Sequence, residues 1–213
     1  MEEALELRDV FRRQRDGILR AIPRGTKYRT DFLAEVIAGW ANAKSANIAV
    51  VSNYLLERGR GSIARKEFLV DLIVFRKGAV RPWISAEFEW SSARTDRKER
   101  RQTLLLERTP AGSSGSFVDQ AHKDRAFDLL KVFLTRPELG VFGGWENSRR
   151  GGVTSVDELI DRDSWFIQGF ARASTGEGFP LIYLAAVRLA RSKGFDFTPA
   201  LFLPENGRLS LVQ

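Results

Sequence analysis

The clearest alternation of apolar and polar residues along the chain lies between Lys66 and Ser91, and it predicts a β-hairpin. Alternate residues of a strand point to opposite faces of the sheet, so a period of two assigns each side chain to a face. One face of the first strand holds Phe68, Val70, Leu72 and Val74. One face of the second strand holds Ile84, Ala86, Phe88 and Trp90. Because the other faces are also largely apolar, we expect the hairpin to lie inside a sheet that is covered on both sides.

Three carboxylates interrupt these apolar faces, namely Asp71 in the first strand and Glu87 and Glu89 in the second. An ionised carboxylate taken out of water is unfavourable unless a cation meets it. The two glutamates stand at i and i+2, so they point the same way and repel each other. Apart from Lys66 at its start, the basic residues of the segment stand at the strand ends beside the turn, at Arg76, Lys77 and Arg81. A divalent cation would neutralise the carboxylates directly, since Mg²⁺ is usually held by one or two carboxylates together with water and phosphate oxygens.

Asp71, a turn and then Glu87-Phe-Glu89 resemble the signature of the PD-(D/E)xK, or restriction-endonuclease-like, nucleases. The resemblance implies a restriction-endonuclease-like core in which Asp71 and Glu87 bind Mg²⁺ or Mn²⁺ and a water is activated against a phosphodiester. The chain departs from the signature at Glu89, where the family has Lys. Some type II restriction enzymes carry the same Glu-x-Glu variant, and Glu89 would then act as general base or bind a second metal ion.

Two flanking helices extend the resemblance to roughly residues 30–145. The run Asp128-Leu-Leu-Lys131-Val is similar to the Asp-Phe-x-Lys-Leu that follows the active-site strand in several branches of the family. It implies that Lys131 supplies the missing lysine and stabilises the pentavalent centre. Glu35 matches a glutamate that the helix before the first core strand often contributes to the metal site. A solvated Glu35, and a Lys131 that merely covers the rim of the sheet, are the alternative interpretations.

The remaining apolar patterns predict a mixed α/β sheet with helices on both sides, folded as a single domain over residues 1–213. Residues 1–25 form an N-terminal helix, 30–145 the core and 150–213 an extension of that core. The predicted helices are Glu2–Ile22, Thr30 or Asp31 to Ala43, Asp119–Thr135 and a short one opened by a capping box at Ser155–Glu158. The predicted strands are Gly140–Trp145, Trp165–Ala171, Phe179–Val187 and a ribbon at Ala200–Leu211, while residues 47–56 fit either a helix or a strand.

The charge of the chain favours a polyanionic partner. Its 213 residues carry a net charge of +7, and 26 of the 34 basic residues are arginine. Arginine forks fit phosphates and guanine edges, so we expect nucleic acid, with DNA favoured over RNA. The first helix alone contains Arg8, Arg12, Arg13, Arg15 and Arg20, which fit either a phosphate backbone or a solvated helix face laced with Glu–Arg pairs. The codon bias of a GC-rich genome is the alternative explanation for the abundant arginine.

Composition also excludes several classes of site. The chain has no cysteine and only one histidine, His122, which excludes disulfides, thiolate metal sites and multi-histidine zinc sites. No apolar run approaches the roughly 20 residues of a membrane span, and the acidic start is unlike a signal peptide. We therefore expect a cytoplasmic protein without a membrane partner. The chain contains no Walker loop, G-x-G-x-x-G or G-x-S-x-G motif.

Three functional interpretations follow. The first is a metal-dependent nuclease, which would use Asp71, Glu87, Glu89 and Lys131 to hydrolyse phosphodiester bonds of nucleic acid. The second is a nuclease-like fold without catalysis, a module that binds nucleic acid or a protein. The third is an α/β domain whose carboxylates are structural and pair with arginines of neighbouring elements. A monomer and a homodimer are both compatible with the pattern.

Overall fold

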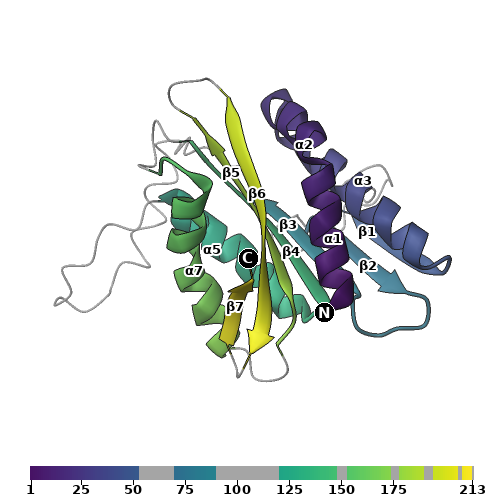
Figure 1. Ribbon diagram of the computed structural model, residues 1–213. Coiled ribbons are helices and arrows are strands. Elements are labelled where there is room, and N and C mark those ends of the chain that lie inside the picture. The colour runs from purple at the N-terminus through teal and green to yellow at the C-terminus, as the bar shows by residue number, and fades with distance from the viewer. Residues whose placement is uncertain are drawn as a thin grey trace, which may run out of the picture.

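Seven strands form a single mixed sheet, in which the spatial order of the strands follows their order in the sequence (Figure 1). The computed structural model describes residues 1–52, 70–89, 120–147, 153–173, 178–189, 194–205 and 208–212. The strands in these ranges are β1 (Ile48–Ser52), β2 (Leu72–Arg76), β3 (Ile84–Glu89), β4 (Leu139–Asn147), β5 (Leu181–Arg188), β6 (Phe195–Glu205) and β7 (Arg208–Val212). The predicted α/β class with a central mixed sheet is thereby confirmed.

The three central strands, β3, β4 and β5, run parallel to one another, and the outer strands on both sides are antiparallel. Helix α5 (Gln120–Thr135) comes between β3 and β4 in the chain, and helix α7 (Val156–Ala173) comes between β4 and β5. The carboxyl ends of β3, β4 and β5 therefore lie together at one end of the sheet. In open α/β sheets, ligands bind outside the carboxyl ends of the parallel strands.

Helices cover both faces of this sheet (Figure 1). One face carries α1 (Glu2–Arg13), α2 (Arg15–Ala21), the 3₁₀ turn η1 (Ile22–Arg24) and α3 (Thr26–Lys44). Its core contains the buried side chains of Leu7, Phe11, Leu33, Ile37, Val74, Ile84 and Ala86. The other face carries α5 and α7, over a second core that contains Leu129, Val132, Phe142, Ile160, Ile167 and Tyr183. The site described below lies between α5 and the sheet.

The predicted hairpin is present as β2 and β3. The two strands are antiparallel, with Leu72 opposite Ala86 and Val74 opposite Ile84. These four side chains face the core under α1 and α3, as the alternation predicts. Residues 66–69 and Trp90, the predicted ends of the hairpin, lie outside the described residues, as do residues 53–56 of the segment that fitted either a helix or a strand.

The N-terminal half differs from prediction in its element boundaries. The predicted helix Glu2–Ile22 is divided at Gln14 into α1 and α2. Helix α3 begins at Thr26, earlier than Thr30 or Asp31. Gly25 precedes it with a φ of 108°, a backbone conformation that glycine adopts without strain. The described part of the ambiguous segment forms strand β1.

The predicted strand Trp165–Ala171 is wrong, because these residues form the second half of helix α7. Their aromatic and β-branched side chains favour a strand. The buried positions nevertheless recur at helical spacing, at Leu159, Ile160, Phe166 and Ile167, while Trp165 is 74% exposed. Helix α7 opens at the predicted capping residues, where the Glu158 backbone N–H donates to Ser155 Oγ at 3.1 Å. The helix is 18 residues long, so it is not the short helix that was expected.

Candidate functional site

Asp71 and Glu87 lie side by side at the carboxyl end of β3, and each carboxylate accepts a hydrogen bond from a backbone N–H of the other arm of the hairpin. The Asp71 N–H donates to Glu87 Oε2 at 2.8 Å, and the Phe88 N–H donates to Asp71 Oδ2 at 2.9 Å. This reciprocal pair follows from the register, because Asp71 directly precedes Leu72, which pairs with Ala86. The hairpin therefore fixes the two carboxylates next to each other before any other element contributes.

Helix α5 adds an ammonium and a third carboxylate to this pair. Lys131 Nζ donates to Glu87 Oε1 at 2.8 Å and also forms an ion pair with Asp128 Oδ1. The side chains of Lys131 and Glu87 are only 14% and 7% exposed. The structure thus brings Asp71, Glu87 and Lys131 together and adds Asp128, which the sequence analysis noted only as part of a motif.

Among these four side chains, carboxylates outnumber cationic groups. Asp71, Glu87 and Asp128 are acidic and Lys131 is basic. Burial and the neighbouring charge of Asp71 raise the pKa of Glu87 from an ordinary 4.5 to about 8, although Lys131 opposes the rise. Burial lowers the pKa of Lys131, but its hydrogen bonds to Asp128 and Glu87 outweigh this and leave its pKa above the ordinary value. The lysine is therefore charged at neutral pH, and Glu87 holds a proton more tightly than an exposed glutamate does.

Glu89 lies two residues beyond Glu87, at the end of β3. Its charge interacts with Arg29 of α3. The Arg29 guanidinium is buried and lies 5.5 Å from the centre of the Trp145 ring. Burial lowers the pKa of Arg29, and Glu89 opposes that change. The carboxyl ends of β3 and β4 therefore carry a basic group as well as the carboxylates.

Glu35 lies apart from this group. It is exposed on α3, whose buried residues Leu33, Ile37 and Trp40 pack on the face of the sheet opposite α5. The structure therefore does not place Glu35 with Asp71 and Glu87 as a further ligand. An α-helix carries successive side chains around its axis, and the apolar stripe of this helix determines which ones face the sheet.

The donor set fits a hard cation with a small number of protein ligands. In the described part of the chain, no group of three or more carboxylate, histidine or cysteine side chains is arranged to hold a metal ion. Asp71 and Glu87 nevertheless provide two adjacent carboxylates, and Asp128 of α5 shares Lys131 with Glu87. Mg²⁺ is usually held by one or two carboxylates, with water and phosphate oxygens completing its octahedron. These two residues therefore match the ligand chemistry of Mg²⁺ or Mn²⁺.

A second polar cluster on the same face is buried except for the partly exposed Arg162, and it was not predicted. Arg125 of α5 donates from Nε to Asp163 Oδ2 at 2.8 Å and from Nη1 to Glu146 Oε2 at 2.7 Å. Arg162 and Tyr183 complete it, with Tyr183 Oη donating to Asp163 Oδ2 at 2.6 Å. The two arginines balance the two carboxylates. The hydrogen bonds of this cluster connect α5 and α7 to β4 and β5.

The buried Arg–carboxylate pairs expected of purely structural acids therefore occur, but at Glu146 and Asp163. In contrast, Glu87 forms an ion pair with a lysine, Lys131, at 2.8 Å. One signal for these polar groups was present in the sequence. Arg125, Asp128 and Lys131 stand three residues apart, which places them on one side of α5. Arg125 belongs to the buried cluster, and Asp128 and Lys131 belong to the group around Glu87. Their partners on other elements could not be read from that spacing.

Comparisons of this chain with profiles of known protein families, with curated proteins and with solved structures give no significant match. No helix in the part of the chain that the structure describes has the length and apolar character that a membrane span requires.

Proposed function

We propose that this chain is a metal-dependent nuclease that hydrolyses phosphodiester bonds of nucleic acid, with DNA as the favoured substrate. The observation that carries the proposal is the reciprocal pair of Asp71 and Glu87, with Lys131 hydrogen-bonded to Glu87. These are three residues that the resemblance to the PD-(D/E)xK nucleases assigns to catalysis. They come from separate segments of the chain and meet at the carboxyl end of a parallel strand.

The order of the elements supports the same proposal. Helix α3, the hairpin β2–β3, helix α5 and strand β4 come in the chain order of the helix, active-site strands, lysine-bearing helix and next core strand that the resemblance implies, with β1 between α3 and the hairpin. Strand β4 pairs in parallel with β3 and places Phe142 beside Glu87. A restriction-endonuclease-like core is therefore the fold we propose for this part of the sheet.

Each residue has a distinct role in the proposed reaction. Asp71 and Glu87 would hold Mg²⁺ or Mn²⁺, which when bound supplies positive charge to polarise the phosphate and to lower the pKa of a water. Lys131, whose raised pKa keeps it charged, would stabilise negative charge on the phosphate oxygens. Glu89, at the end of β3, would accept the proton of the attacking water.

A non-catalytic module that binds nucleic acid or protein is the second candidate, and one observation favours it. Lys131 already gives Glu87 a cationic partner at 2.8 Å, so this carboxylate has a counter-charge without a metal ion. In that case the repulsion between Asp71 and Glu87 would be relieved by protonation of Glu87, whose pKa is about 8. Metal-dependent cleavage separates the two candidates.

The test is incubation of the purified chain with plasmid DNA, single-stranded DNA and RNA, in Mg²⁺, in Mn²⁺ and in chelator. We expect metal-dependent cleavage that Asp71→Asn and Glu87→Gln each reduce by more than the roughly 10- to 100-fold typical of outer-shell partners of a metal. Asp161→Asn is the matched control, because Asp161 is an exposed carboxylate on α7. Cleavage that persists in both site variants, or its absence on all three substrates, would favour the binding module.

A further inference from the structure

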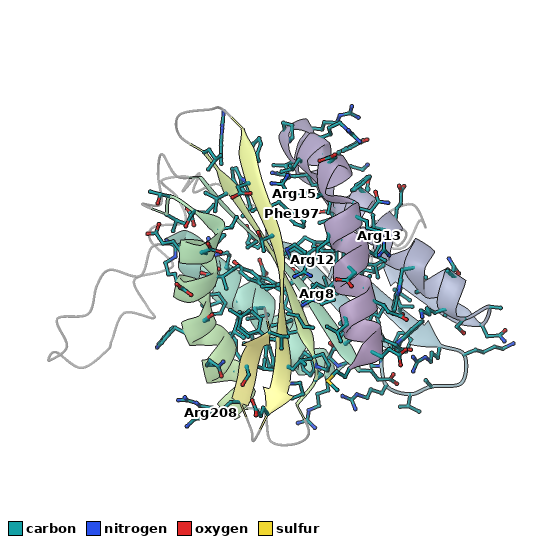
Figure 2. All side chains as sticks on the ribbon, viewed as in Figure 1. Arg8, Arg12, Arg13, Arg15, Phe197 and Arg208 are labelled. Carbon is teal, nitrogen blue, oxygen red and sulfur yellow. The ribbon has the colours of Figure 1, made fainter. Side chains whose placement is uncertain are left out.

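Three arginines form a row on one side of the N-terminal helices. Arg8 and Arg12 lie on α1, and Arg15 opens α2 after the break at Gln14. Figure 2 shows Arg8, Arg12 and Arg15 on the side of α1 that faces β6 and Phe197, with Arg13 on the other side of the helix. Spacings of four and three residues place side chains on one helix face, so the sequence itself aligns this row.

The acidic partners of the row do not neutralise it. Asp9 Oδ1 lies 3.5 Å from both Arg8 Nε and Arg12 Nη1, and Asp196 Oδ1 lies 3.1 Å from Arg15 Nη2. One carboxylate is thus shared between two guanidinium groups at long distance. Three positive charges face two negative charges, which leaves a surplus of one positive charge.

Arg8 is the unusual member of the row. Its side chain is only 9% exposed, and its buried Nε and Nη1 atoms have no hydrogen-bond partner among the described residues. A guanidinium has five N–H donors, and burying such donors without acceptors is unfavourable. By contrast, Arg12 and Arg15 are about half exposed, at 49% and 48%. Arg8 therefore adds positive charge behind Arg12 and Arg15, the two members of the row that an anion can reach.

The length and position of the row favour a nucleic-acid strand as that anion. The four residues from Arg8 to Arg12 rise about 6 Å along α1, close to the axial rise of two phosphate steps along one strand. Arg15, at the far end of the row, pairs with Asp196, which lies opposite Val187 on β5. Val187 in turn lies opposite Glu146 of β4, so the row ends at the same end of the sheet as the carboxylates of the candidate site. The apolar residues of α1, Leu7 and Phe11, are buried in the core and are not available to insert into a lipid surface.

We infer that Arg12 and Arg15, with the buried charge of Arg8 behind them, bind the phosphate backbone of a nucleic-acid strand. This inference goes beyond the proposed function, since binding through the row needs neither a metal ion nor cleavage. The row lies on the face of the sheet opposite Glu87 and contributes no group to the proposed reaction. Its role is to hold the polyanion.

The experiment is a fluorescence-anisotropy titration of labelled DNA and RNA of the same length, in chelator, over a series of salt concentrations. The protein carries Asp71→Asn, so that cleavage cannot affect the result and failure of the nuclease proposal leaves this test intact. Adding Arg12→Gln and Arg15→Gln removes two exposed phosphate contacts. We expect the negative slope of log affinity against log salt concentration to become shallower by about 1.8 for duplex DNA. The affinity at about 0.1 M salt should fall roughly 50-fold.

Two further variants separate the row from general electrostatics. The double variant Arg172→Gln, Arg208→Gln removes the same charge from exposed positions elsewhere, and Figure 2 shows Arg208 far from the row. It should leave the salt slope unchanged. Asp9→Asn removes the carboxylate shared by Arg8 and Arg12 and should tighten binding.

Equal losses in the two double variants, or unchanged affinity in Asp9→Asn, would overturn the inference. Stronger binding to vesicles of anionic lipid than to either nucleic acid would also overturn it. Tighter binding of DNA than of RNA, or the reverse, would support the row and identify the preferred sugar.

Discussion

The titration of Glu87 gives a prediction whose size follows from the structure. Burial and the charge of Asp71 raise its pKa in the folded chain to about 8, against an ordinary value of 4.5 in the unfolded chain. The folded state therefore binds this proton more tightly than the unfolded state does. Protonated Glu87 stabilises the fold below pH 4.5, and this contribution is lost as the pH rises through about 8.

The difference between these two pKa values corresponds to about 5 kcal/mol in the free energy of unfolding, as an upper bound. Glu87→Gln replaces the carboxyl by a neutral amide of the same shape and removes the titration. We expect this variant to be slightly less stable than the wild type at pH 4.5, because an amide has a single acceptor oxygen and cannot accept from both the Asp71 N–H and Lys131 Nζ. That loss is about 1 kcal/mol. Above pH 8 the variant should be the more stable protein, by about 2 to 4 kcal/mol.

Urea denaturation of both proteins in chelator, at a series of pH values from 4.5 to above 8, measures this crossover. A divalent ion that binds the folded wild type should restore its stability at the upper end, by about 2.7 kcal/mol at a concentration 100 times its dissociation constant. Stability curves that run parallel over the whole range would refute the reasoning, since Glu87 would then titrate alike in the folded and unfolded chains.

Three other substitutions test neighbouring parts of the structure. Arg125→Met should lower the free energy of unfolding by about 3–5 kcal/mol in urea denaturation, because it removes the guanidinium that donates to the buried carboxylates of Asp163 and Glu146. Gly144→Ala should cost about 1–3 kcal/mol in the same assay, because the added methyl group would collide with the Tyr183 hydroxyl. Lys131→Met should reduce the rate of cleavage without abolishing metal binding, as measured by single-turnover cleavage and by calorimetry with Mn²⁺.

The hairpin and the α/β class were predictable because a strand period of two assigns faces without knowledge of the rest of the fold. Asp71 and Glu87 meet because the turn between β2 and β3 fixes their register, and that information is local. The contact between Lys131 and Glu87 joins residues far apart in the sequence, so local patterns could not predict it. It was expected only from the resemblance to a nuclease motif, and the structure shows Lys131 Nζ donating to Glu87 Oε1 at 2.8 Å.

The failures have a common physical origin in contacts between distant segments. Residues Trp165–Ala171 have strand-forming side chains, yet burial at a helical period places them in α7. In the sequence Arg125 stands beside other basic and polar residues, which suggests an exposed position. Its partners Glu146 and Asp163 come near it only in the folded chain. Glu35 shares a helix with core residues, but the side of the sheet on which that helix packs depends on the topology.

Manganese binding tests the central claim most directly, since the account requires Asp71 and Glu87 to share one divalent ion. Electron paramagnetic resonance of free Mn²⁺ during titration with the protein measures both affinity and stoichiometry. We expect one ion per wild-type chain, binding that weakens as the pH falls below the pKa of Glu87, and loss of the site in both Asp71→Asn and Glu87→Gln while Asp161→Asn binds normally. Equal Mn²⁺ binding by all four proteins, or none by the wild type, would contradict the account.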